Sequence, residues 1–137
     1  MFTFRAAALT GALLLVSGAR APDTVVRPTK FDYTMTTLSN GLQVVFLEDH
    51  STPIVHLAIW YHVGSKDEKP GRTGFAHLFE HLMFKGSRNV RPDQHPSWIT
   101  SVGGQANAFT DEDATVYWET VPAQYLPLVL WLEADRM

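Results

Sequence analysis

The residues best suited to chemistry in this sequence are His77, Glu80 and His81, which form an H-x-x-E-H pattern. On a helix, residues three and four positions apart lie on one face, so these three side chains would point the same way. Two imidazoles at that spacing can share one zinc ion, and the carboxylate beside them can take a proton from a water molecule. The pattern therefore predicts metal-assisted hydrolysis, with Glu80 as the general base.

A catalytic zinc site needs a third protein ligand besides the two histidines. The sequence has no cysteine, so that ligand must be a histidine or a carboxylate. Glu119, Glu133 and Asp135 are carboxylates that could be recruited locally, but ordinary surface charge on a strand or helix is the better interpretation of them. The remaining histidines stand in no such pattern and are interpreted as surface or strand residues: His50, His56, His62 and His95.

Composition limits the class of protein. The 137 residues are 45% hydrophobic and carry a formal net charge of -3, which fits one globular domain and argues against a nucleic-acid partner. The first 21 residues are typical of a secretory signal peptide, because Arg5 precedes an apolar run (residues 6–16) and then small residues. We expect cleavage after Ala19 or Ala21 and a secreted or periplasmic protein. A frayed or membrane-anchoring N-terminus is the alternative.

The domain itself is predicted to cover residues 31–137, after a leader linker over residues 22–30. Two strand-like runs, 33–38 and 42–48, flank Asn40-Gly41, which is a strong hairpin signal. The apolar run 54–63 predicts a central strand covered on both faces. Further elements are expected in this order: a helix over 75–85, a helix over 93–102, strands over 105–110 and 115–121, and a helix over 127–136. Together they predict an α+β fold with an antiparallel or mixed sheet packed by helices.

The helix over 75–85 carries the H-x-x-E-H pattern, with Thr73 expected as its N-cap and Gly86 just after its end. Its apolar residues fall on one stripe that could pack on a sheet: Phe75, Leu78, Phe79 and Leu82. The two histidines and Glu80 fall on nearly the opposite side, where they would face a site.

Several ordered segments resemble one family. The stretch Gly71–Ser87, which reads GRTGFAHLFEHLMFKGS, is similar to the zinc segment of the pitrilysin/insulinase metallopeptidases, the inverzincins. Segments 39–42, 63–68, 103–110 and 130–137 resemble, in the same order, the family's first hairpin, the loop before the zinc helix, the substrate strand and a following helix. The likeness covers almost everything after the leader.

The resemblance implies that His77 and His81 bind Zn²⁺ and that Glu80 is the general base. It places the third ligand, a glutamate, roughly seventy residues after His81 and therefore beyond Met137. Asn107 and Ala108 match the edge strand to which a peptide substrate adds as an extra strand. The implied function of the complete protein is a zinc endopeptidase for short or unfolded peptides, with a second domain or subunit closing a chamber. Residues 31–137 would then be the truncated N-terminal part of its first metallopeptidase domain, which carries the H-x-x-E-H motif. The alternative is an inactive fragment or a non-catalytic partner or scaffold subunit.

Overall fold

The computed structural model describes residues 30–137. The predicted signal peptide and all but the last residue of the predicted linker lie outside the described residues. The chain divides into two compact units, residues 1–47 and 48–137. In the first unit, β1 (Thr34–Thr37) pairs with β2 (Gln43–Phe46) in an antiparallel hairpin. Its turn is closed by a hydrogen bond from the Leu38 N–H to the Leu42 carbonyl, and Gly41 has a φ of 90°. The expected hairpin is present.

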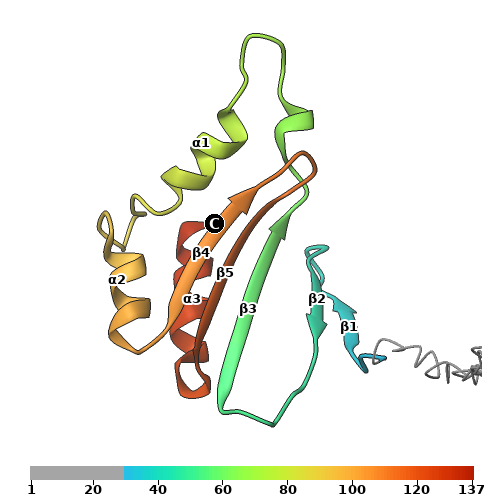
Figure 1. Ribbon diagram of the computed structural model, residues 1–137, viewed down its shortest axis with the longest axis vertical. Helices are drawn as coiled ribbons and strands as arrows, with labels where there is room; N and C mark the ends of the chain where they lie inside the picture. Colours follow the sequence, from blue (N-terminus) through green and yellow to red (C-terminus); the bar gives the residue numbers. More distant parts are fainter. Residues whose placement is uncertain (1–29) are drawn as a thin grey trace, which may run out of the picture. The chain divides into compact units, whose positions relative to one another are not determined.

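The second unit is built on a three-stranded antiparallel sheet with the order β3–β5–β4. Its strands are β3 (Ile54–Tyr61), β4 (Gln105–Thr110) and β5 (Thr115–Pro122). β4 and β5 form a hairpin in which Thr110 faces Thr115, and β3 pairs with the other side of β5 from much earlier in the sequence (Figure 1). β3 and β4 are therefore the two edge strands of this sheet.

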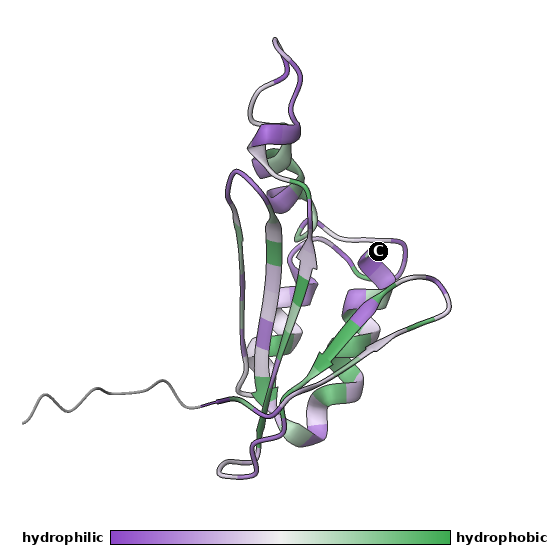
Figure 2. Cartoon of the chain, turned by 90° about the vertical axis from the view of Figure 1, so that its right-hand side faces the viewer, coloured by the Kyte–Doolittle hydropathy of each residue, from purple (hydrophilic) through white to green (hydrophobic). Residues whose placement is uncertain are grey.

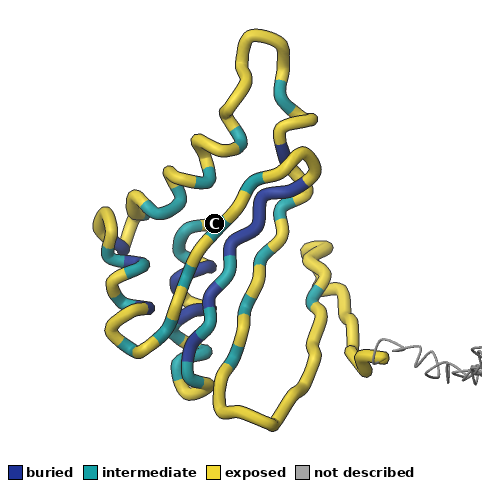
Figure 3. The backbone as a smooth tube through the Cα atoms, in the orientation of Figure 1, coloured by how far each residue is buried: buried dark blue, intermediate teal, exposed yellow. Residues whose placement is uncertain are grey.

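The central strand is β5, and the prediction that residues 54–63 form it was wrong. Along β5 most residues are buried, whereas β3 alternates between exposed and half-buried positions, and Ile54 and Trp60 are more than half exposed (Figure 3). A continuous apolar run shows that both faces of a strand are hydrophobic. It carries no information on which neighbours the strand pairs with, and that depends on topology.

Three α-helices accompany the sheet: α1 (Phe75–Leu82), α2 (Gln94–Ser101) and α3 (Leu126–Arg136). Single 3₁₀ turns, Ser65–Asp67 and Ala123–Tyr125, precede α1 and α3. Both α1 and α2 contact β4, and α3 lies against β5 (Figure 1). α2 ends where Gly103 adopts a φ of 80°, a left-handed conformation that glycine adopts without strain. None of the helices in the described part is long and apolar enough to cross a bilayer.

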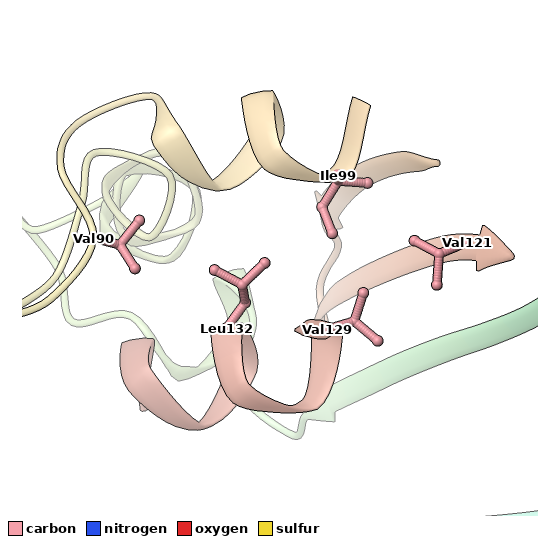
Figure 4. Packing of buried hydrophobic residues seen from close by; sticks show 5 residues of the cluster. All are labelled: Val90, Ile99, Val121, Val129 and Leu132. Atoms are coloured by element: carbon pink, nitrogen blue, oxygen red, sulfur yellow. The ribbon is translucent and has the colours of Figure 1, made fainter. Parts of the chain in front are cut away.

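The hydrophobic core lies where α2, α3 and β5 meet. Five buried residues form it, and Figure 4 shows their side chains turned toward one another: Val90, Ile99, Val121, Val129 and Leu132. Burying one such side chain contributes about 1.5–3 kcal/mol relative to leaving it in water. This cluster therefore fixes α2 and α3 on the sheet.

No residue of α1 is buried. Its apolar stripe, expected to pack on a sheet, is instead about half exposed, from 46% at Phe75 to 59% at Phe79. The side of α1 that meets the strands carries Ala76, Glu80 and, from the apolar stripe, only Phe79, and Met83 follows just after the helix. The expectation failed because helical periodicity identifies an apolar side but does not say which neighbour covers it.

Candidate metal centre

The N-terminus of α1 is capped by a carboxylate from the preceding loop. Gly74, not Thr73, is the N-cap; its φ is 87° and it has no side chain with which to cap. Glu68 takes over this role by accepting hydrogen bonds from the N–H groups of Gly74 (2.7 Å) and Ala76 (2.8 Å). These bonds lower the pKa of Glu68, that from Ala76 most strongly. The loop from which Glu68 reaches the helix is largely hydrophilic (Figure 2).

The two histidines of α1 converge as the spacing predicts. Nε2 of His77 lies 2.9 Å from Nε2 of His81, and both rings are exposed on the helix surface. Zinc–nitrogen distances are about 2.0–2.1 Å, so two nitrogens this close can bind the same ion. Two neutral imidazoles whose ring nitrogens point at one position fit the donor set of a zinc site.

Glu80 lies one turn along from His77 and is partly buried against β4. Its Oε2 accepts a hydrogen bond from the Thr110 hydroxyl at 2.6 Å. The Thr110 oxygen lies 3.4 Å from the Thr115 hydroxyl, which in turn donates to the Val63 carbonyl at 2.9 Å. The carboxylate is thus tied to the end of the edge strand.

Between α1 and the ends of β3 and β5 there is an apolar hollow of about 230 Å³. Tyr61, Phe79, Met83 and Tyr117 contribute to its lining. It lies on the strand-facing side of α1, and neither histidine of the candidate metal centre lines it.

A second cluster of ionisable groups is buried between α2, β5 and α3. Nε2 of His95 lies 3.6 Å from Oε1 of Glu119 and 3.7 Å from Oε1 of Glu133, and the three side chains are at most 4% exposed. The prediction that Glu119 and Glu133 carry ordinary surface charge was wrong, and so was the prediction that His95 is a surface or strand residue, since it is buried in α2. The strand pattern did contain a signal of burial for Glu119. Residues two positions apart share a face of a strand, so Glu119 lies on the same face of β5 as the buried Tyr117 and Val121.

These three residues could also hold a metal ion, because their ligand atoms lie within 4.8 Å of one another. A cation already occupies the cluster, however. Arg136 donates from Nε to Glu133 (2.9 Å) and from Nη2 to Glu119 (3.2 Å) and Glu133. Its guanidinium carbon also lies 4.5 Å from the centroid of the Tyr117 ring. We therefore interpret the cluster as a buried ion-pair network rather than a metal site.

Burial and charge separate the two carboxyl groups of this network. Burial, reinforced by the neighbouring Glu133, raises the pKa of Glu119 to about 9. Burial alone would also raise the pKa of Glu133, but His95, Glu119 and the charge of Arg136 together hold it at about 2. The pair therefore keeps one proton at neutral pH.

The structure brings His77 and His81 together and leaves the third ligand undetermined. Among residues 30–137, the only group of three potential ligands is that of His95, Glu119 and Glu133. Asn107 and Ala108 lie in the middle of β4, an edge strand, and the Ala108 N–H donates to the Asn107 side chain at 2.9 Å. Sequence reasoning did not single out Thr110 or Glu68, because each contacts the site through a hydrogen bond that spacing does not predict.

The architecture of the described part is α+β, with antiparallel sheets and three α-helices. It is similar to the crystal structure of a protease from Helicobacter pylori, with a TM-score of 0.75 and 33% identity over 78% of this chain and 26% of that one. Residues 43–137 match the sequence profile of insulinase, peptidase family M16. The chain belongs to this family, as the resemblance of its ordered segments indicated, and the predicted fold class is confirmed.

Its curated relatives include proteins named as zinc proteases. An uncharacterized zinc protease of Streptomyces coelicolor is 40% identical over 74% of this chain and 22% of its own length. The zinc protease PqqE of Helicobacter pylori is 36% identical over 74% of this chain and 23% of its own length. The chain thus spans about a quarter of the length of the relatives it matches.

Proposed function

We propose that the protein containing this chain is a zinc-dependent endopeptidase that hydrolyses short or unfolded peptides. The observation that carries this proposal is the distance of 2.9 Å between the Nε2 atoms of His77 and His81. The carboxylate of Glu80, on the same helix, is held beside them by a hydrogen bond from the edge strand β4. His77 and His81 would hold the ion. The third ligand in this proposal is a glutamate outside residues 1–137.

A zinc ion held there would supply Lewis acidity, which polarises a peptide carbonyl and acidifies a water molecule. Glu80 would accept the proton from the attacking water and pass it to the departing amine. Thr110 donates to only one of the two Glu80 oxygens, Oε2, at 2.6 Å. The other oxygen can therefore accept a hydrogen bond from water.

The substrate class follows from β4. An edge strand presents backbone N–H and C=O groups to which an extended peptide can add as a further strand. Asn107 and Ala108 would pair with the substrate backbone, and Thr110 on the same strand binds Glu80. A peptide paired along β4 would thus run toward the general base. Backbone pairing selects for extended, flexible segments rather than for particular side chains.

The test is the substitution Glu80→Gln, which keeps the shape of the side chain and removes its basicity. We expect zinc to remain bound and hydrolysis to fall by about 100-fold or more, since a general base contributes about 10²–10⁴-fold. Glu112→Gln, at an exposed position, is the control and should leave both properties unchanged. Hydrolysis that survives in the Glu80→Gln variant contradicts the proposed role.

A second candidate is an inactive fragment or a non-catalytic partner or scaffold subunit. It is favoured by the ligand set, which contains two histidines and no third ligand grouped with them in the described part. Zinc stoichiometry and peptidase activity of the 137-residue chain, compared with a longer form carrying the downstream glutamate, separate the two. Full activity of the short chain with one tightly bound zinc would exclude the second candidate.

The proposal includes export, with residues 1–21 as a signal peptide, and a second family domain or subunit that closes a chamber around the peptide. N-terminal sequencing of the protein recovered from the periplasm or the medium tests the first part. A mature chain that begins at Arg20 or Pro22 is the expected result, and a retained Met1 would contradict it.

A further inference from the structure

We propose that Thr110 is a positioning residue for Glu80: its hydroxyl sets the orientation of the carboxylate beside the two histidines. The catalytic part of this inference rests on the proposed function, whereas the structural part does not. Oγ1 of Thr110 lies 2.6 Å from Oε2 of Glu80, and both side chains are partly buried. Charge-assisted O–H···O⁻ bonds are typically this short, about 2.5–2.7 Å.

The direction of this hydrogen bond is fixed by chemistry. An ionised carboxylate can only accept, so the single hydroxyl proton of Thr110 must be donated to Glu80. The Thr115 hydroxyl lies 3.4 Å from the Thr110 oxygen but has no proton to donate to it, because its own goes to a backbone carbonyl. Thr115 is the cross-strand partner of Thr110 and donates to the Val63 carbonyl at 2.9 Å. The position of the Thr110 side chain is therefore set by the strand pairing of its backbone, and its hydroxyl proton is left for Glu80.

Glu80 depends on this contact for its order. A glutamate side chain has three rotatable bonds and loses its conformational freedom only where contacts hold it. Among the described residues, Thr110 is the one hydrogen-bond partner of the Glu80 carboxylate. The alternative is a purely structural role, in which this hydrogen bond only helps to attach α1 to β4. The two interpretations differ in what happens to Glu80 when only the hydroxyl is removed.

The experiment compares three variants of the 137-residue chain by NMR. Thr110→Val keeps the shape and removes the hydroxyl, and Thr110→Ser keeps the hydroxyl. Thr100→Val is the matched control, because the Thr100 hydroxyl donates to the Pro96 carbonyl within α2 at 2.8 Å. Three-bond coupling constants of Glu80 report whether its side chain occupies one rotamer or averages over several.

We expect a single Glu80 rotamer in the wild-type, Thr110→Ser and Thr100→Val chains, and averaging in Thr110→Val. A Glu80 side chain that is equally ordered in Thr110→Val, or that averages already in the wild type, would overturn the proposal. If Thr110→Val does not fold, Thr110→Ala, which removes the hydroxyl without adding a second methyl group, replaces it.

The catalytic part is tested in the protein that hydrolyses peptides. Thr110→Val should lower kcat by about 10–100-fold, the usual cost of misplacing a reacting group, and leave KM unchanged, while Thr110→Ser restores kcat. An unchanged kcat together with a disordered Glu80 would overturn the positioning role. If Glu80→Gln itself leaves hydrolysis intact, the proposed function fails while the NMR result stands.

Discussion

Arg136 of α3 donates a hydrogen bond to Glu119 of β5 inside the protein, with 3.2 Å between Nη2 and Oε1 and side chains that are 4% and 1% exposed. The same guanidinium binds Glu133, and it lies over the rings of Tyr117 and Phe84. A charge removed from water in this way is stable only while its partners remain, so the network ties α3 to the sheet and to the segment that follows α1.

Arg136→Met should therefore destabilise the fold strongly. The substitution keeps an unbranched side chain but leaves two buried carboxyl groups without their cation, at a cost of about 3–5 kcal/mol. Urea unfolding measures the loss. Arg91→Met, at an exposed position, is the control and should change the free energy of unfolding by less than about 0.5 kcal/mol. Equal effects of the two substitutions would mean that the buried network contributes nothing.

The same network predicts how stability changes with pH. The pKa of Glu119 rises from its ordinary value of 4.5 to about 9 on folding. Between those values the unfolded chain ionises while the folded protein keeps the proton. Stability contributed by Glu119 is therefore fully present below about pH 4.5 and is lost as the pH rises toward 9, by at most about 1.4 kcal/mol per pH unit.

Glu133 acts in the opposite direction, since its pKa falls from 4.5 to about 2. Its contribution is present above about pH 4.5 and is lost as the pH falls toward 2. Free energies of unfolding measured from pH 3 to 9 in wild type and in Glu119→Gln check both slopes. The decline above pH 4.5 should flatten in the variant, and a wild-type profile that is already flat there would contradict the assignment.

Zinc should bind to α1 and not to the buried network. We expect His81→Ala to weaken zinc binding by at least about tenfold in calorimetric titrations, because it removes one of two ligands. His95→Ala should leave the zinc affinity unchanged, as should His56→Ala, whose ring binds Thr120 on β5. Treatment with a chelator should remove the ion from the exposed pair without unfolding the chain. The reverse pattern, with binding lost only in His95→Ala, would move the metal to the cluster of His95, Glu119 and Glu133.

Replacing Glu68 should weaken the metal centre from a distance. Glu68→Ala leaves the first N–H groups of α1 without their acceptor, so the turn that carries His77 should fray and zinc affinity should fall. Faster amide exchange at Ala76 is the direct measurement. Glu112→Ala provides a matched loop carboxylate that caps no helix. Unchanged exchange in Glu68→Ala would show that the helix start does not need this carboxylate.

The parts of the fold that depend on local chemistry could be predicted from the sequence. Asn40-Gly41 marked the hairpin turn, and the spacing of His77 and His81 brought their nitrogens together. Each of these features is decided within a few residues by backbone conformation or helical geometry. For that reason a single sequence was enough to place them.

What could not be predicted depends on contacts between distant segments. The order of the strands, the exposed stripe of α1 and the burial of His95 all follow from which elements pack together. Glu119 and Arg136 are 17 residues apart and belong to different elements, so no spacing rule connects them. The hydrogen bond from Thr110 to Glu80 spans 30 residues and was missed for the same reason.

The alternation along β4 has a consequence for tolerated sequence changes. Ala106, Ala108 and Thr110 share the half-buried face of the strand, and Gln105, Asn107 and Phe109 share the exposed one. Shifting the pairing of β4 by one residue would exchange the two faces and turn the Thr110 hydroxyl away from α1. The hairpin formed by β4 and β5 should thus accept many substitutions but no insertion or deletion of a single residue between Gly104 and Thr110. In this segment the number of residues is constrained more tightly than their types.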